Sequence, residues 1–243
     1  MGTCVYCGKP AGLFRKQHKE CHLKSLAGTE EIVGILREEV ISREDFQEIE
    51  QRIDLIAQES LYKSKCPKKL LARGWDGLIE GVFARGRLVE FEDERLSSFI
   101  NYFKLSQQDL DGNGSFSNFV KASVIRQIEE GEVPDKMKVE GDLPFNFQKG
   151  EKLVWLFQGV DYAEGDTLKD AGMMGVTTRH IYFNGKSKGF RIKYSKITAF
   201  DEASNGLCVQ RDAVTAKPQF FLTEDGWFVC KLVKSLAQLD AVE

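Results

Sequence analysis

The clearest chemical pattern in this chain of 243 residues lies at its start, where Cys4, Cys7, His18 and Cys21 stand at metal-ligand spacing. Zinc takes four sulfur or nitrogen ligands in a tetrahedron, and a Cys-x-x-Cys turn supplies two thiolates from one tight loop. We expect a short helix over residues 13–24, which would place His18 and Cys21 on one face. The pattern predicts a Cys3His zinc centre. Four protein ligands leave no position for water, so this zinc would be structural.

Two alternatives to this ligand set remain open. His22 follows His18 by four residues and could replace Cys21 as the fourth ligand, although the Cys21 thiolate is the better donor. The four residues could also be small core cysteines and solvent-facing histidines that hold no metal. The basic side chains nearby could touch phosphates or form a solvated helix face, and these are Arg15, Lys16, Lys19 and Lys24.

Length and composition bound the kind of protein. The chain can form two ordinary domains, and its 42% hydrophobic and 29% charged residues are typical of a folded protein without a membrane span. The net charge of -3 argues against a protein that coats nucleic acid. The first residues lack the apolar segment of a secretory leader, and the cysteines have metal-like rather than disulfide-like spacing, so we expect a reducing cytoplasm.

Residues 27–133 have the apolar period of helices, with acidic outer faces. We expect one helix to start at a Thr29 cap, another near Ser42, and a third, central to the core, at Pro67. The stretch LLARGWDGLIEGVFARGRLVEFEDERLSSFINYFKLS resembles the helix pair of tellurite-resistance TerB-like domains. The resemblance implies an all-helical domain and a bacterial stress-type system. That family carries an Asp-Gly pair where this chain has Arg85 and Gly86, so no functional residue is carried over.

The segment DLDGNGSFSNFV, which starts at Asp109, has several oxygen-bearing residues at the positions of a calcium-binding EF-hand loop. Val120 stands where a bidentate Glu should complete the loop, so tight calcium binding is not expected. The alternative is a polar turn in which Asp111 or Asn113 begins the loop and Ser115 or Ser117 caps the next helix.

Residues 134–148 break the helical period and are predicted to be a linker. After them, short apolar and β-branched runs bounded by turns predict an antiparallel sheet or barrel, and the chain ends in an amphipathic helix. This order, with the central stretch GVTTRHIYFNGKSKGFRIKYSKITAFD, resembles the pleckstrin-homology-like and GRAM-like superfold. Some members of that superfold hold lipid headgroups and many bind proteins, so the resemblance implies recognition.

Basic residues surround the Asn184-Gly185 turn of this region. They could meet anionic lipid phosphates or nucleic acid, or they could only protect the edges of the sheet. His180 has no ligand-type neighbours along the chain and is interpreted as structural. The candidate anion-binding residues are Arg179, Lys186, Lys188, Arg191 and Lys193.

The sequence contains no Gly-x-Ser-x-Gly element, phosphate-binding glycine loop or metalloprotease helix. We therefore predict an α+β protein with a zinc module (1–26), a helical domain (27–133), a linker (134–148) and a helix-capped β domain (149–243). The predicted function is non-enzymatic binding or scaffolding of a protein partner, with a structural Zn2+. The alternative is a membrane-surface or nucleic-acid-responsive regulator that uses the basic patches of the zinc module and the β domain.

Overall fold

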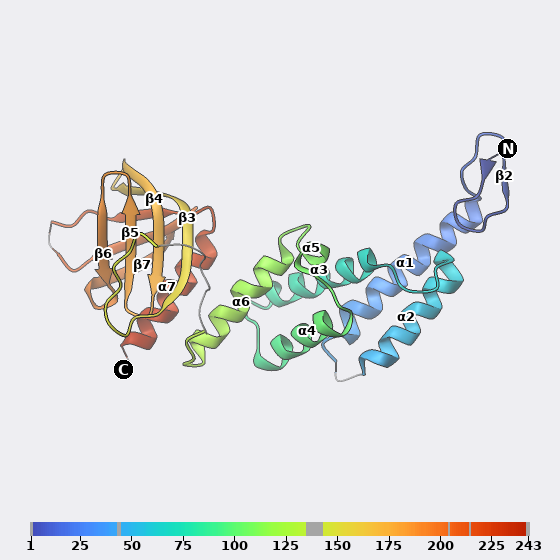
Figure 1. The fold of residues 1–243 in the computed structure, drawn as a ribbon, viewed down its shortest axis with the longest axis horizontal. Coiled ribbons are helices and arrows are strands. Elements are labelled where there is room, and N and C mark those ends of the chain that lie inside the picture. Colours follow the sequence, from blue (N-terminus) through green and yellow to red (C-terminus); the bar gives the residue numbers. More distant parts are fainter. Residues whose placement is uncertain (1, 43–44, 135–142, 204, 214, 242–243) are drawn as a thin grey trace. The chain divides into compact units, whose positions relative to one another are not determined.

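The computed structural model describes residues 2–42, 45–134, 143–203, 205–213 and 215–241 (Figure 1). Contacts divide the chain into two compact units, Met1–Ser123 and Val124–Glu243. Each unit is described by itself below. Among the described residues, no helix has both the length and the apolar composition that crossing a bilayer requires.

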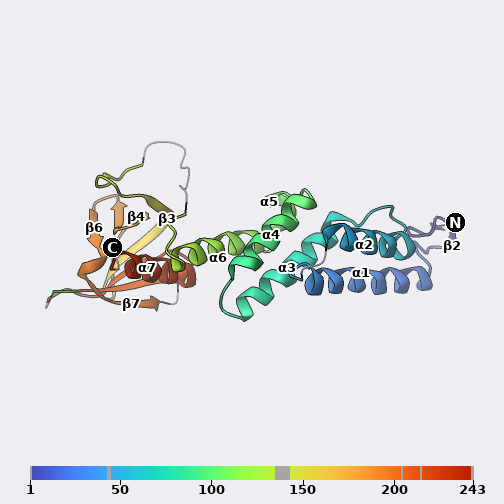
Figure 2. The ribbon, with the colours of Figure 1, turned by 90° about the horizontal axis from the view of Figure 1, so that it is seen from below.

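The first unit begins with two short paired strands and continues as a helical bundle. Figure 2 shows α1 and α2 side by side, and α3 also packs against α1. Its buried centre includes Trp75, which stacks on Phe99 at a ring-centroid distance of 6.3 Å. The elements are β1 (Gly2–Thr3), β2 (Pro10–Gly12), α1 (Lys19–Glu39), α2 (Phe46–Leu61), α3 (Lys68–Ala84), α4 (Glu90–Tyr102), α5 (Gln107–Leu110) and α6 (Ser115–Glu129).

One helix replaces the two that the sequence suggested around Gly28. We expected helices over 13–24 and from Thr29, but α1 runs without a break from Lys19 to Glu39, so both expected bounds were wrong. Gly28 lies inside the helix because it allows close packing: a Cβ added there would lie 2.3 Å from Cβ of Ser60 on α2. The glycine that resembled a break is a contact point between two helices.

The Asp109 segment forms the polar turn before α6. Asp111 accepts hydrogen bonds from the Ser117 backbone N–H at 3.0 Å and from its hydroxyl at 2.7 Å, which ties the loop to the first turn of the helix. Asp109 instead pairs with Lys68 at 2.8 Å. These two carboxylates are therefore held by protein donors. The polar turn was predicted, but the residue that caps α6 is Asp111 and not Ser115 or Ser117.

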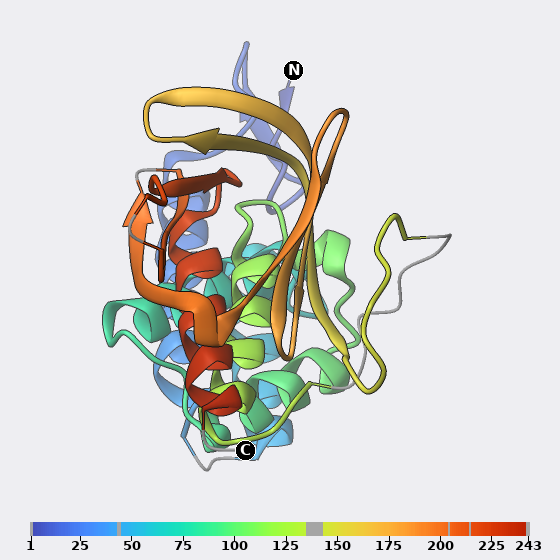
Figure 3. The same ribbon diagram turned by 90° about the vertical axis from the view of Figure 1, so that its left-hand side faces the viewer.

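The second unit is a seven-stranded antiparallel sheet closed by a C-terminal helix, the PH-like arrangement that the sequence pattern predicted. The strand order is β6-β5-β4-β3-β9-β8-β7. Figure 3 shows the strong bend of this sheet around α7. The elements are β3 (Leu153–Glu164), β4 (Thr167–Thr177), β5 (His180–Gly185), β6 (Gly189–Lys193), β7 (Ile197–Ala203), β8 (Gly206–Arg211), β9 (Gln219–Leu222) and α7 (Gly226–Asp240), with a 3-10 turn over Tyr194–Lys196.

Strand β3 joins the two halves of this sheet because it pairs with both β4 and β9. Its register against β4 shifts between Phe157 and Val160, where Gly159 has a φ of 64°. An extra residue in one strand bends it and increases its twist. This bulge lets one long strand take part in both halves, while β6 and β7 remain as the two edges.

The contact boundary falls inside α6 and not within the stretch 134–148. Phe119 and Ala122 belong to the core of the first unit, whereas Ile125 and Ile128 belong to the core of the second. Part of the expected linker, residues 135–142, lies outside the described residues. In the described part, the rings of Phe145 and Phe147 lie 5.9 and 5.2 Å from that of Tyr182 on β5.

Candidate functional site

The four sequence-predicted metal ligands come together at the start of the chain. Cys4 and Cys7 lie in the turn between β1 and β2, His18 is the residue before α1, and Cys21 is in the first turn of α1. Their ligand atoms all lie within 4.8 Å of one another. Nδ1 of His18 lies 3.4 Å from Sγ of Cys7 and 3.7 Å from Sγ of Cys21. Ligands about 2.3 Å from a tetrahedral zinc lie about 3.8 Å apart, so the cluster fits that ion.

His18 is held in the orientation that a ligand needs. Its Nε2 lies 2.9 Å from the carbonyl oxygen of Pro10, so this nitrogen carries the proton and Nδ1 presents its lone pair to the cysteines. In metal-binding histidines generally, the ring nitrogen that does not bind the metal donates a hydrogen bond to a carbonyl or carboxylate, and this bond fixes the tautomer. The Pro10 carbonyl and the Cys7 sulfur raise the pKa of His18, because both favour a protonated ring.

The thiols of the cluster differ in their electrostatic surroundings. Burial acts to raise the pKa of Cys4, but backbone N–H groups of Cys7, His18 and Tyr6 outweigh it and lower the pKa to about 6. Among these, the His18 N–H donates to Cys4 Sγ at 3.4 Å. A thiolate stabilised in this way is ready to bind a cation. Burial raises the pKa of Cys21, which lies 4.0 Å from the Tyr62 hydroxyl.

His22 is not part of the cluster. Its Nδ1 lies 3.3 Å from the hydroxyl of Tyr6, and the ring is not among the four grouped ligands. The geometry therefore favours Cys21 over His22 as the fourth ligand. Cys66 lies in the helical unit, where burial raises the pKa of its thiol to about 12, a value that makes it a poor ligand or nucleophile.

The five basic residues predicted near the Asn184-Gly185 turn do not form one cluster. Lys186 and Lys188 lie in the turn between β5 and β6, whereas Arg179 and Lys193 lie at the other end of these strands, where His180 pairs with Lys193. Arg191 is between them, opposite Tyr182. Arg179, Lys186, Arg191 and Lys193 are exposed.

The β5-β6 turn already holds an internal anion. The backbone N–H groups of Lys186, Ser187 and Lys188 donate to the carboxylate of Asp170 on β4, at 3.1, 2.8 and 2.7 Å. The Ser187 N–H is the strongest of the contacts that hold the pKa of Asp170 well below its usual range. Nζ of Lys188 pairs with Glu164 at 3.2 Å. The part of the turn best suited to a phosphate is therefore occupied by the protein's own carboxylates.

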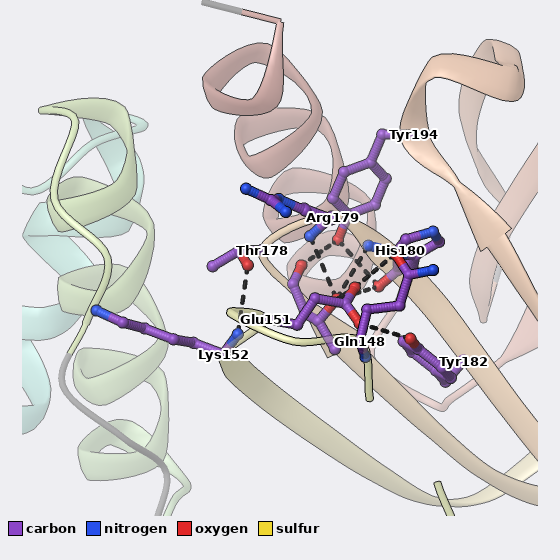
Figure 4. A network of polar contacts seen from close by, with 9 residues as sticks. Gln148, Glu151, Lys152, Thr178, Arg179, His180, Tyr182 and Tyr194 are labelled. Carbon is purple, nitrogen blue, oxygen red and sulfur yellow. Dashed lines mark hydrogen bonds and ion pairs between the residues drawn. The ribbon is translucent and has the colours of Figure 1, made fainter. Parts of the chain in front are cut away.

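A second polar cluster, not predicted from the sequence, surrounds Glu151 (Figure 4). The side chain of Glu151 is fully buried, and its carboxylate lies 2.5 Å from Nδ1 of His180 and 2.5 Å from the Tyr182 hydroxyl. The Thr177 hydroxyl and the Gln148 N–H also donate to it. Burial acts to raise the pKa of Glu151, but these donors outweigh burial and lower the pKa.

This cluster has the composition of a catalytic site, but its Glu151 and His180 side chains are buried. A cavity of about 130 Å³ lies nearby and is lined by Lys152, Thr178 and Arg179 among others, but neither Glu151 nor His180 lines it. The described donors to the carboxylate all come from the protein itself. The cluster therefore fastens the segment before β3 to β4 and β5, which agrees with the structural role predicted for His180.

A larger groove of about 540 Å³ runs between β7 and α7 of the same unit. Ile197 and Phe200 contribute to it from β7, and Ala237 and Ala241 from α7 and its end, so its centre is apolar. Lys234 and Asp240 place one charge of each sign among the lining residues. The strand beside this groove, β7, is an edge of the sheet, and among the described residues it pairs with β8 alone.

The fold and the clusters define a class: a PH-like β unit joined to a helical unit that begins with a Cys3His cluster. No family model and no curated protein matches the chain. The TerB-like resemblance therefore gains no support from these comparisons, and it contributes nothing to the functional proposal.

Several solved structures resemble part of the chain. The Vps36 N-terminal PH domain matches at a TM-score of 0.35 and 12% identity, covering 40% of this chain and 86% of that domain. The C-terminal domain of an unknown protein from Leishmania infantum matches at a TM-score of 0.26 and 21% identity, and the match covers 30% of this chain and 71% of that one. A chain of the 8S snRNP assembly intermediate matches at a TM-score of 0.32 and 12% identity, and the match covers 37% of this chain and 84% of that one. At these scores, the fold assignment depends on the strand order and α7 and not on these likenesses.

Proposed function

We propose that this chain is a non-enzymatic binding protein whose PH-like unit takes an extended segment of a protein partner along β7. The observation that carries the proposal is the apolar groove of about 540 Å³ beside an edge strand. An edge strand has unpaired backbone N–H and C=O groups, which a peptide can pair with as an additional strand. Alternate side chains of that peptide would point into the groove between Phe200 and Ala237.

The Cys3His cluster supports this role by stabilising the start of the chain. A closed set of four ligands would hold zinc as a structural ion, with no position for an activated water. The Glu151 carboxylate is buried and hydrogen-bonded within the protein, and it does not line the nearby cavity of about 130 Å³. Both polar clusters thus support recognition rather than catalysis, and steady turnover of a nucleotide, ester or peptide by the purified chain would contradict the proposal.

The test of the groove is selection of peptides from a random library on the full chain, followed by affinity measurements. Gln238 is exposed on α7 and lines the groove, so Gln238→Trp should fill it without changing the core and should weaken the selected peptides at least tenfold. Lys186→Trp, at the tip of the β5-β6 turn, is the matched control and should have no effect. Equal affinity of the wild type and Gln238→Trp would place the peptides elsewhere and refute the proposal.

A further inference from the structure

We propose that the loop between the two ligand pairs of the metal centre is a membrane-contact surface, which inserts Leu13 and Phe14 into the interface of an anionic bilayer. This surface belongs to the first unit and is independent of the peptide groove in the second. We call the exposed apolar residues Val5, Leu13 and Phe14 the apolar tip.

The apolar tip is unusually exposed. Phe14 is 96% exposed, Leu13 71% and Val5 67%, and none of the large apolar side chains among the described residues is more exposed than Phe14. Isolated exposed apolar residues are common, but two adjacent ones at the end of a small metal-bound loop form a compact surface that water solvates poorly. Such a surface is expected where the protein meets an apolar partner.

The backbone holds Phe14 outward at a cost in energy. Its φ is 65°, a left-handed conformation that a bulky residue rarely adopts, and it follows Gly12, whose φ is 96°. The loop is fixed on both sides by the ligand pairs, and the Val5 N–H donates to the Lys16 carbonyl at 2.9 Å, which joins the two ligand-bearing segments. The loop geometry thus keeps the Phe14 ring exposed, in the position that the proposed contact requires.

The charge around the tip fits an anionic surface. Residues 2–19 contain no Asp or Glu but four exposed cations, Lys9, Arg15, Lys16 and Lys19. A zinc ion with three thiolates and a neutral imidazole carries one formal negative charge, which the four cations outweigh. The chain as a whole is negative, so an anionic membrane would attract this end and repel the acidic helices.

Lipid fits this combination better than nucleic acid. Proteins that bind single-stranded nucleic acid stack its bases on aromatic rings, and Phe14 could serve in this way, but Leu13 and Val5 offer no ring and would stay in water. The interface of a bilayer accepts aliphatic and aromatic side chains together, with Lys and Arg at the level of the headgroups. The absence of a spanning helix among the described residues is compatible with such peripheral contact.

The experiment measures binding of the zinc-loaded full chain to phosphatidylcholine vesicles with and without phosphatidylserine. We expect binding only with phosphatidylserine, weakened by salt. The double variant Leu13→Ser/Phe14→Asn should lose at least tenfold in affinity, because Asn accepts the left-handed backbone and removes only the apolar ring. The control Leu55→Ser removes a 56% exposed leucine from α2 and should bind like the wild type.

A reporter variant shows whether the tip enters the bilayer. Tryptophan fluorescence of Phe14→Trp should shift to shorter wavelength on these vesicles and be quenched by brominated lipid, after subtraction of the three native tryptophans. Zinc content confirms that each variant is folded at this end. The proposal is overturned if the wild type does not bind the vesicles at low salt, or if Leu13→Ser/Phe14→Asn binds them as well as the wild type. Binding of single-stranded RNA in place of vesicles would also overturn it. Gln238→Trp should bind vesicles normally, which separates this test from that of the peptide groove.

Discussion

His18 combines two interactions in the Cys3His cluster. One ring nitrogen faces Cys7 and Cys21, and the other bonds to the Pro10 carbonyl at 2.9 Å. Because the second bond fixes the ring, the first nitrogen needs no reorientation to bind a cation. His22, four residues later, has the same chemistry but faces Tyr6. The ligand set thus depends on orientation and not on residue type alone.

Because His22 faces away from the cluster, substitutions of Cys21 and His22 should affect zinc affinity differently. Cys21→Ser should lower zinc affinity by more than about 100-fold, since loss of a direct ligand exceeds the 10–100-fold effect of losing a supporting hydrogen bond. His22→Ala should retain a full equivalent of zinc. Metal analysis after purification in chelator checks both, and loss of zinc from His22→Ala alone would show that His22 is the ligand.

Asp170 gives a prediction about acid stability. Its pKa is lowered in the folded protein by the Ser187 N–H first and by the neighbouring N–H groups, so its charged form stabilises the fold at pH values above its unfolded pKa of about 3.9. This contribution is lost as the pH falls from about 4 towards the folded pKa. Asp170→Asn should therefore lower Tm at pH 7, and the difference from the wild type should shrink progressively below about pH 4.

The control for this experiment is Asp166→Asn, which changes an exposed carboxylate in the turn between β3 and β4. Its Tm should match that of the wild type across the same pH range. A difference between Asp170→Asn and the wild type that stays constant down to pH 2 would show that the hydrogen-bond geometry, and not the charge, stabilises the turn.

At the scale of elements, the packing of α1 against α2 depends on one glycine. A Cβ at Gly28 would lie 2.3 Å from Cβ of Ser60, whereas a Cβ at Gly34, on the same helix, meets no atom within 4 Å. Real side chains do not approach as closely as the first distance requires. The two glycines therefore have different physical roles although both lie inside α1.

Substitution of these glycines should have opposite effects on the helical unit. Gly28→Val should destabilise it by about 1–3 kcal/mol, because the helices must move apart. Gly34→Ala should stabilise it by about 0.5–1 kcal/mol, since alanine loses less backbone entropy in a helix. Urea unfolding followed by helical circular dichroism measures both, and equal destabilisation by the two substitutions would contradict this packing.

Features that depend on residues close together in the chain were predicted from the sequence. The four ligands lie within one short segment, so their spacing already implied a cluster. The short apolar runs bounded by turns after residue 149 predicted the antiparallel sheet, and the amphipathic end of the chain predicted α7. Contacts between distant residues were not predictable. Glu151 finds its partners Thr177, His180 and Tyr182 more than two dozen residues away, and the packing that keeps Gly28 inside α1 depends on α2.

At the scale of the molecule, we expect the proposed metal centre and the two units to contribute to stability separately. Residues 2–18 contain short strands and few buried apolar side chains, among them Cys4 and Ala11, whereas the buried residues of α1 start further along at Ser25. A segment of this kind depends on metal ligation for its order.

Removal of zinc should therefore have a local effect. After chelation, amide exchange and proteolytic cleavage at Arg15 and Lys16 should increase strongly, while helical and sheet signals of the two units stay unchanged. Readdition of zinc should restore protection. Loss of the helical signal on chelation would show instead that the metal centre supports the whole first unit.

The division of α6 between two cores has a practical consequence for fragments of this protein. A fragment that starts at residue 134 would lack Ile125 and Ile128, which are 5% and 2% exposed within the second core. Two missing isoleucines leave voids worth several kcal/mol. Expression of the sheet by itself should succeed only when the fragment keeps the last turns of α6, so the useful place to cut the gene lies at or before Val124.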